Sequence, residues 1–228
     1  PYRRQRQMCI RDSVIYNDFD EYHVRLENID QTNALLADIR TIVGDYPRSK
    51  MLPENLRKDI LKVIQSAEQD GFVDYITLSS GLLFSSKYAT DYASLQTEGM
   101  YNNLRRAPYN CEGYLDGIEV VRADYRELFT QYKDVPGVVF LVDPPYLSTE
   151  VGAYKCHWRL SDYLDVLTLL TSTSYFYFTS NKSSIIELCE WIAEAKINAN
   201  PFRNAIRKEM RTQLNYNSKY TDIMLYRR

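Results

Sequence analysis

Strands and helices alternate along the second half of this chain of 228 residues. Three apolar or aromatic runs predict strands at 118–122, 138–142 and 175–179, and three amphipathic segments predict helices at 124–132, 161–170 and 183–195. Strands that are separated by helices are joined by crossover connections and lie parallel. The alternation therefore predicts an α/β fold with a mainly parallel sheet covered by helices, in which ligands bind at the carboxyl ends of the strands.

The two ends of the chain extend this pattern. The expected elements are a strand at 14–18, helices at 21–43 and 53–68, and strands at 207–214 and 222–226. The last two strands flank the turn-rich segment NYNSKY and predict an antiparallel C-terminal hairpin. Residues 72–117 are less regular, with scattered Gly and Ser, and predict loops and short elements.

Composition excludes several classes of protein. The chain is 45% hydrophobic and 25% charged, which is typical of a globular domain, and its formal net charge is -2. No apolar run approaches the roughly 20 residues that cross a bilayer, and no signal peptide is recognisable, so we expect a cytoplasmic protein. The cysteines are far apart, and we expect reduced thiols and no metal site at Cys9, Cys111, Cys156 and Cys189.

The most distinctive segment is VVFLVDPPY, in which a polar motif directly follows an all-apolar strand. The motif consists of Asp143, Pro144, Pro145 and Tyr146. A stiff turn is the structural alternative, because Asp and Pro are common in turns. A motif of this length, placed at the sheet edge where α/β proteins bind ligands, favours a functional site.

This motif and its surroundings resemble the amino-methyltransferases of DNA, in particular the adenine methyltransferase family, over most of residues 14–228. The resemblance implies a Rossmann-like methyltransferase sheet, S-adenosylmethionine as cofactor, and methylation of the exocyclic 6-amino group of adenine in double-stranded DNA. In the family's mechanism, the carboxylate corresponding to Asp143 and the carbonyl corresponding to Pro144 accept hydrogen bonds from that amino group. Pro145 restricts the backbone, and Tyr146 stacks on a base that is flipped out of the duplex.

The resemblance also implies three residues at the cofactor. Asp18 corresponds to the acidic strand end that binds the ribose hydroxyls, and Asp124 and Tyr125 lie in the segment near the adenine ring. Helix capping is the alternative role for both aspartates. The family's glycine-rich loop, which precedes the position of Asp18, has no counterpart here. We therefore expect that coding sequence upstream of Val14 was lost and that the chain as written methylates DNA poorly.

A mostly helical target-recognition insert is expected at 30–115, between catalytic segments at 14–29 and 116–228. Side chains suited to base edges or phosphates occur in the insert and in the locally basic C-terminal segment. These candidates for DNA binding are Asn103, Arg105, Arg106, Arg207, Arg211 and Lys219. A solvated surface is the alternative for any one of them. A restriction endonuclease is a candidate partner for such an enzyme.

The first residues have a different interpretation. RRQRQMCIRD, from Arg3 to Asp12, resembles the one-frame translation of a transposase-tagging adapter used in short-read sequencing. A basic, disordered arm is the alternative, and we expect residues 1–13 to be an artefact that is exposed and separate from the core.

Other activities remain open for the catalytic part. Methylation of the 4-amino group of cytosine poses the same chemical problem as methylation of adenine. An inactive DNA-binding module is an alternative of another class, although the intact motif favours catalysis. Methylation of a protein glutamine or of RNA is a further alternative.

Overall fold

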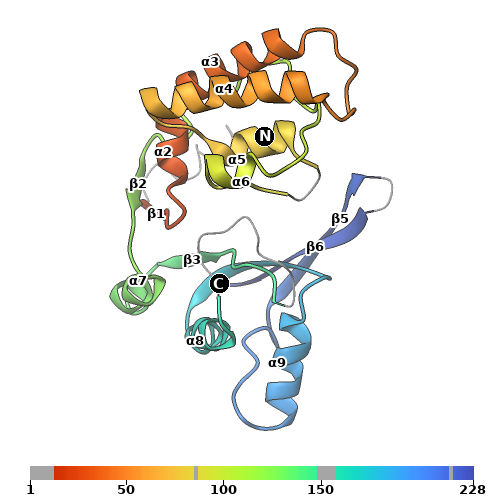
Figure 1. Cartoon of the computed structure of the whole chain (residues 1–228). Helices are drawn as coiled ribbons and strands as arrows, with labels where there is room; N and C mark the ends of the chain where they lie inside the picture. Colours follow the sequence, from red (N-terminus) through yellow and green to blue (C-terminus); the bar gives the residue numbers. More distant parts are fainter. Residues whose placement is uncertain (1–12, 85–86, 148–157, 216–217) are drawn as a thin grey trace. The chain divides into compact units, whose positions relative to one another are not determined.

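The computed structural model describes residues 13–84, 87–147, 158–215 and 218–228 (Figure 1). The chain divides into two compact units, Pro1–Arg122 and Ala123–Arg228, and each is described by itself. The expected artefact at 1–13 lies outside the described residues except for Ser13. None of the helices in the described ranges combines the length and the apolar character needed to cross a bilayer.

Unit 1 contains a two-stranded parallel sheet and a group of helices (Figure 1). Strands β1 (Val14–Asn17) and β2 (Ile118–Val121) pair in register from Val14 opposite Ile118. The helices between them are α2 (Tyr22–Glu27), α3 (Ile29–Val43), α4 (Glu54–Asp70), α5 (Tyr75–Leu82) and α6 (Tyr92–Leu95).

The helices of unit 1 enclose their own core. Ile39 of α3, Ile60 and Ile64 of α4, and Leu78 of α5 are fully buried in one hydrophobic cluster. Ile60 and Ile64 lie one helical turn apart, so they share the face of α4 that faces this cluster. Gly44 ends α3 with a φ of 54°, a backbone conformation that favours glycine.

One expectation for unit 1 was wrong in detail. The single helix expected at 21–43 is interrupted at Asn28, whose side-chain amide donates to the carbonyl of Val24 over 2.8 Å. A side chain that competes for a backbone carbonyl in this way disfavours a continuous helix. Residues 72–117, where loops and short elements were expected, contain the short helix α5, which begins where the carboxylate of Asp74 accepts a hydrogen bond from the amide of Thr77 at 3.0 Å.

Unit 2 contains a four-stranded sheet in the order β3-β4-β6-β5. Its elements are α7 (Tyr125–Tyr132), β3 (Val139–Val142), α8 (Leu160–Leu170), β4 (Ser174–Ser180), α9 (Ile185–Glu194), β5 (Ile206–Asn215) and β6 (Ser218–Arg227). Strands β3 and β4 are parallel, whereas β6 is antiparallel to both β4 and β5. The antiparallel C-terminal hairpin is therefore confirmed.

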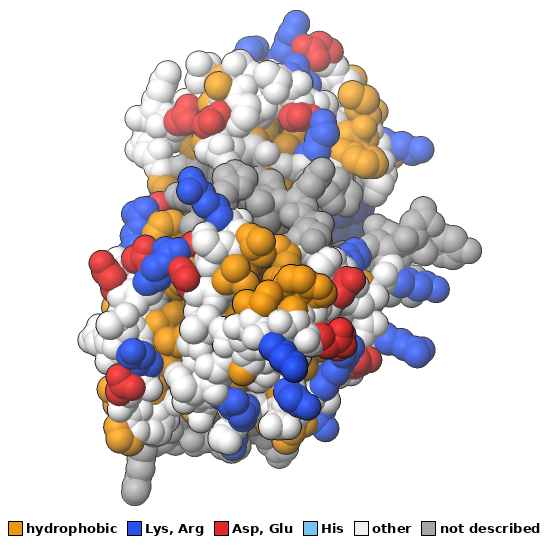
Figure 2. All heavy atoms as spheres, turned by 90° about the horizontal axis from the view of Figure 1, so that it is seen from below, with side chains coloured by type: hydrophobic (Ala, Val, Ile, Leu, Met, Phe, Trp, Pro, Cys, Tyr) orange, Lys and Arg blue, Asp and Glu red, His pale blue; other side chains and the backbone are white. Residues whose placement is uncertain are grey.

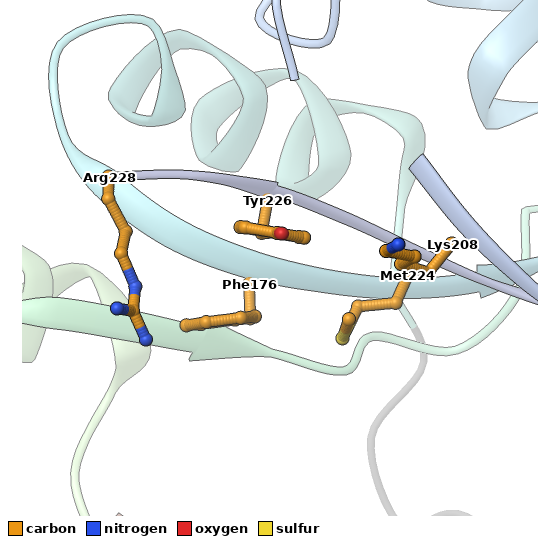
Figure 3. A pocket seen from close by; sticks show the side chains of 5 residues that line it. All are labelled: Phe176, Lys208, Met224, Tyr226 and Arg228. Carbon is orange, nitrogen blue, oxygen red and sulfur yellow. The ribbon is translucent and has the colours of Figure 1, made fainter. Parts of the chain in front are cut away.

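The two faces of this sheet differ. Tyr175 and Tyr177 of β4 are buried on one face, in a cluster that includes Val166 of α8 and Ile185 of α9. On the other face Phe176 stacks on Tyr226 with ring centroids 5.1 Å apart, in a hollow of about 460 Å³ (Figure 3).

Exposed apolar side chains surround that second face. Leu141 pairs with Phe176 across the sheet and is 71% exposed, and Met210 of β5 is 65% exposed. Figure 2 shows hydrophobic side chains gathered in a patch on the molecular surface, with Lys and Arg side chains beside it.

The fold class is a mixture of helices with parallel and antiparallel strands, which is compatible with a methyltransferase fold. One mainly parallel sheet was expected, and the described strands instead form two sheets with two parallel and two antiparallel pairings. The Rossmann-like arrangement and the limits of the target-recognition insert stay predictions.

Candidate active site

The Asp-Pro-Pro-Tyr motif directly follows β3 in unit 2, as expected. Val142, the last residue of the strand, is 6% exposed and anchors the strand end in the core. Asp143 is exposed, Pro144 is buried, and Tyr146 is half-buried. The strand thus fixes the start of the motif and leaves the carboxylate of Asp143 accessible.

Two hydrogen bonds hold the backbone of the motif and of Leu147, the residue that follows it. The hydroxyl of Tyr163 in α8 donates to the carbonyl oxygen of Pro145 over 2.9 Å. The amide of Ser184 donates to the carbonyl oxygen of Leu147 over 3.2 Å. These bonds connect the motif to the elements packed beside it.

The side chain of Tyr146 is also held in place. Its hydroxyl is hydrogen-bonded to Ser180, a buried residue at the end of β4. Burial, followed by the negative charges of Asp222 and Asp143, raises the pKa of Tyr146, so the phenol stays neutral at physiological pH. The tyrosine can therefore present an uncharged aromatic ring.

The carboxylate of Asp143 has no hydrogen-bond donor among the described residues. Although Asp143 is exposed, partial desolvation by the surrounding residues raises its pKa, and the like charge of Asp222 raises it further. Asp222 lies opposite Ser180 in the β4–β6 pairing and accepts a hydrogen bond from the hydroxyl of Thr212 at 2.6 Å. As far as the described residues are concerned, the oxygen atoms of Asp143 are thus available to accept hydrogen bonds from a ligand.

Asp18 is 1% exposed, and the first turn of α2 surrounds its carboxylate. It accepts hydrogen bonds from the amides of Tyr22 and His23 at 2.7 and 2.6 Å, and His23 Nδ1 lies 2.5 Å from it. Burial alone would raise the pKa of Asp18, but the hydrogen bonds from His23 and Tyr22 outweigh burial and lower it. Asp18 therefore stabilises the start of α2, and its role at a cofactor stays a prediction.

Asp124 and Tyr125 lie at the start of α7 in unit 2. The carboxylate of Asp124 is exposed and accepts a hydrogen bond from the amide of Arg126 at 2.8 Å, which makes it the N-cap of the helix. The ring of Tyr125 stacks on Trp158 at 5.1 Å, and its hydroxyl donates to Asp162 over 3.1 Å. Asp18 belongs to unit 1, so its convergence with Asp124 and Asp143 stays a prediction.

Sequence reasoning missed three residues beside the motif, namely Tyr163, Ser180 and Asp222. Tyr163 is 5% exposed and occupies a position of α8 that its spacing predicts as core. Asp222 had a detectable signal, because it is an acidic residue in the otherwise apolar run DIMLY of a predicted strand.

The predicted DNA-binding residues of unit 1 lie near a basic hollow. Arg40, Arg48 and Arg106 line this hollow of about 320 Å³ together with Asp45, and we call it the arginine hollow. The Nη1 atoms of Arg40 and Arg48 donate to the carbonyl oxygens of Arg105 and Leu104 at 2.8 and 2.7 Å. The two arginines thus fix the loop that carries Arg106.

The other two candidates, Arg105 and Asn103, make different contacts. Arg105 lies over the ring of Tyr109, with its Cζ atom 4.7 Å from the ring centroid. The backbone amide of Asn103 donates to the carbonyl oxygens of Gly81 and Tyr101, which holds this segment against α5.

The predicted DNA-binding residues of unit 2 share one face of the β5–β6 hairpin. Arg207, Arg211 and Lys219 are exposed and occupy alternate positions of the paired strands. Arg207 is paired with Glu209 over 2.7 Å, whereas Arg211 has no ion pair among the described residues. Among the cysteines, Cys111 and Cys189 are free thiols, and Cys9 and Cys156 lie outside the described residues.

No protein-family model matches this chain. A protein of Haemophilus influenzae named "Putative methyltransferase" is 33% identical to it over 227 residues. The similarity covers 97% of this chain and 76% of that protein. Identity of this extent over most of both sequences shows common family membership, and the chain therefore belongs to the methyltransferase family of that protein.

Proposed function

We propose that this protein transfers a methyl group from S-adenosylmethionine to the 6-amino group of adenine in double-stranded DNA. The observation that carries the proposal is the Asp143 carboxylate, which follows a parallel strand and has no donor among the described residues. A rigid Pro-Pro backbone and a neutral tyrosine follow it. Acceptors held in this way suit a substrate that presents N–H groups.

The chemistry of an aromatic amino group requires such acceptors. Its lone pair is delocalised into the ring, so the nitrogen attacks poorly until hydrogen bonds favour a pyramidal geometry. In the proposed reaction, Asp143 accepts a hydrogen bond from one amino hydrogen and the carbonyl of Pro144 accepts one from the other. The nitrogen would take the methyl group as the sulfur–carbon bond breaks, S-adenosylhomocysteine would leave, and the methylated nitrogen would release one proton. The carboxylate also stabilises the positive charge that develops on nitrogen, and the ring of Tyr146 stacks on the flipped base.

The cofactor would supply an electrophilic methyl group on its sulfonium. Asp124 suits a cofactor contact because its carboxylate is exposed at the start of α7. Asp18 already accepts three close hydrogen bonds, and the hydroxyl of Tyr16 lies 3.4 Å from its Oδ1. A ribose hydroxyl would replace that weakest contact.

DNA phosphates are proposed to bind the arginine hollow of unit 1 and the basic face of the β5–β6 hairpin. A guanidinium carries five N–H donors, so Arg40 and Arg48 retain donors after their bonds to the loop carbonyls. Arg106 is exposed and lines the same hollow. Phosphate contacts of this kind give affinity without sequence specificity.

Transfer of tritiated methyl groups to duplex DNA, followed by nucleoside analysis, tests the proposal on the full-length gene product. We expect label in N6-methyladenine and a loss of at least about 100-fold in Asp143→Ala, since one preorganised electrostatic contact contributes about that factor. Asp134→Ala is the control, because Asp134 is an exposed aspartate in the turn before β3.

The nucleoside separates the alternatives. Label in N4-methylcytosine would show that the substrate base is cytosine and not adenine. Label in RNA or protein alone would show that DNA is not the substrate. Full activity of Asp143→Ala would reject the proposed mechanism.

A further inference from the structure

Tyr163 is a buried tyrosine whose hydroxyl is hydrogen-bonded to the backbone of the Asp-Pro-Pro-Tyr motif. The residue is 5% exposed, and its ring packs edge-on against Trp158 with centroids 5.1 Å apart. Its hydroxyl donates to the carbonyl oxygen of Pro145 over 2.9 Å. The side chain thus reaches from α8 to the backbone of the motif.

This hydrogen bond restrains ψ of Pro145, the one backbone dihedral angle that the proline ring leaves free to rotate. The proline ring fixes φ, so the direction of the carbonyl determines ψ and the direction in which the chain enters Tyr146. On the other side, the amide of Ser184 holds the carbonyl of Leu147. The backbone is therefore fixed on both sides of Tyr146.

We infer that Tyr163 is a positioning residue for methyl transfer, which holds the Pro144 carbonyl and the Tyr146 ring in their working orientation through the Pro145 carbonyl. The inference rests on the proposed function for its catalytic consequence. Positions of reacting groups affect rates steeply, because a misplacement of about 1 Å can cost a factor of 100. Removal of one hydroxyl should therefore affect turnover more than binding.

The chain offers a matched control in Tyr175. Its hydroxyl donates to the carbonyl oxygen of Pro201 over 2.7 Å, and the residue is fully buried in the same hydrophobic cluster as Tyr163. Tyr163→Phe and Tyr175→Phe each remove one hydroxyl that binds a proline carbonyl. Only the first of these carbonyls belongs to the motif.

Steady-state kinetics of the full-length protein on duplex DNA is the first test. We expect kcat of Tyr163→Phe to fall about tenfold with KM for S-adenosylmethionine unchanged, as expected for an interaction that matters in the transition state. Tyr175→Phe should keep the kcat of the wild type. Equal kcat in Tyr163→Phe and the wild type would overturn the inference.

Amide hydrogen exchange is the second test and does not depend on activity. Exchange in a peptide spanning 139–147 should accelerate about fivefold in Tyr163→Phe, the factor expected for one net hydrogen bond. In Tyr175→Phe the acceleration should occur near Pro201 instead. Unchanged exchange at 139–147 would refute the proposed restraint.

The two tests separate this inference from the proposed function. If the wild type leaves DNA adenine unmodified, the proposed function fails together with the catalytic part of the inference, and exchange still decides whether Tyr163 restrains the motif. If the wild type methylates adenine and Tyr163→Phe behaves like Tyr175→Phe in both tests, the inference alone fails.

Discussion

Asp18 and Asp143 each follow a strand, and their surroundings shift the pKa of the two carboxyl groups in opposite directions. Hydrogen bonds from His23 and Tyr22 lower the pKa of Asp18 in spite of its burial. Partial desolvation and the charge of Asp222 raise the pKa of Asp143. A pKa shift on folding is a contribution to stability that depends on pH, so the two carboxylates should contribute with opposite signs.

Replacement of each aspartate by asparagine tests this difference. For Asp18, whose pKa is lowered, the stabilising contribution is present above the pKa of an unfolded aspartate and is lost as pH falls through the folded value. Asp18→Asn should therefore lower the thermal midpoint of unfolding at pH 7. The free energy of unfolding should fall by about 1–3 kcal/mol, because buried amides lose a charged acceptor. The loss should shrink at pH 3.

For Asp143, whose pKa is raised, the stabilising contribution is present below the pKa of an unfolded aspartate and is lost as pH rises through the folded value. Asp143→Asn should therefore raise the midpoint slightly at pH 7 and leave it unchanged at pH 3. The effect is small because the side chain is exposed. Midpoints that move in the same direction for both variants at pH 7 would contradict the assigned environments.

Sequence reasoning located the motif itself but not the residues that hold it. The position of Asp143 after an apolar strand follows from the local pattern. The contact of Tyr163 with Pro145 joins residues 18 positions apart and depends on the packing of α8 beside β3. Local patterns contain no information on such a contact, and a tyrosine at a core position is indistinguishable from any other.

At the scale of elements, the loop at Leu104–Arg106 derives its order from arginines of another segment. Arg40 lies in α3 and Arg48 follows it, and both donate to carbonyl oxygens of the loop. The loop therefore presents Arg106 from a fixed backbone. A fixed cation loses less conformational entropy on binding a phosphate than one on a disordered loop.

Arg106→Gln should weaken DNA binding and reduce the slope of log Kd against log salt concentration by about 1, as expected for the loss of one phosphate contact. Fluorescence anisotropy with a labelled duplex at several salt concentrations measures this slope. Arg57→Gln is the control, because Arg57 binds Glu54 and the carbonyl oxygens of Gln96 and Glu98. An unchanged slope in Arg106→Gln would show that Arg106 makes no phosphate contact.

Elements with a strong periodicity of apolar residues were predicted well. Features that depend on a side chain binding a backbone carbonyl, or on burial of a weak helix former, were not. The strand before Asp143 and the helix at α4 follow from runs of apolar residues and their spacing. The break at Asn28 depends on one amide that binds a carbonyl, and α5 consists of residues with weak helix propensity. Burial of α5 in the core of unit 1 outweighs that propensity.

At the scale of the whole molecule, each unit has a hydrophobic core of its own. All buried residues of one cluster lie in unit 1, and those of the other lie in unit 2. The sequence predicted one sheet because alternation shows which elements are strands, whereas the partner of each strand depends on contacts between distant residues. The pairing of β1 with β2 joins residues more than 100 positions apart.

Separate cores predict separate responses to core substitutions. Leu78→Ala in unit 1 and Val166→Ala in unit 2 each truncate a fully buried side chain. The free energy of unfolding should fall more for the leucine, by about 2–5 kcal/mol. Amide exchange should accelerate mainly in 13–122 for the first variant and in 123–228 for the second. Equal acceleration throughout the described residues in both variants would show that the two cores unfold together.

The strand order β3-β4-β6-β5 also determines when unit 2 can form during synthesis on the ribosome. Strand β5 is synthesised before β6, and among the described strands it pairs with β6 alone, so its backbone groups lack that partner until β6 is present. The helices of unit 1 can collapse much earlier, because α3 to α6 are close in sequence. An incomplete chain released before β6 is synthesised would therefore carry a folded helical unit followed by an unpaired strand, which is the kind of segment that chaperones bind.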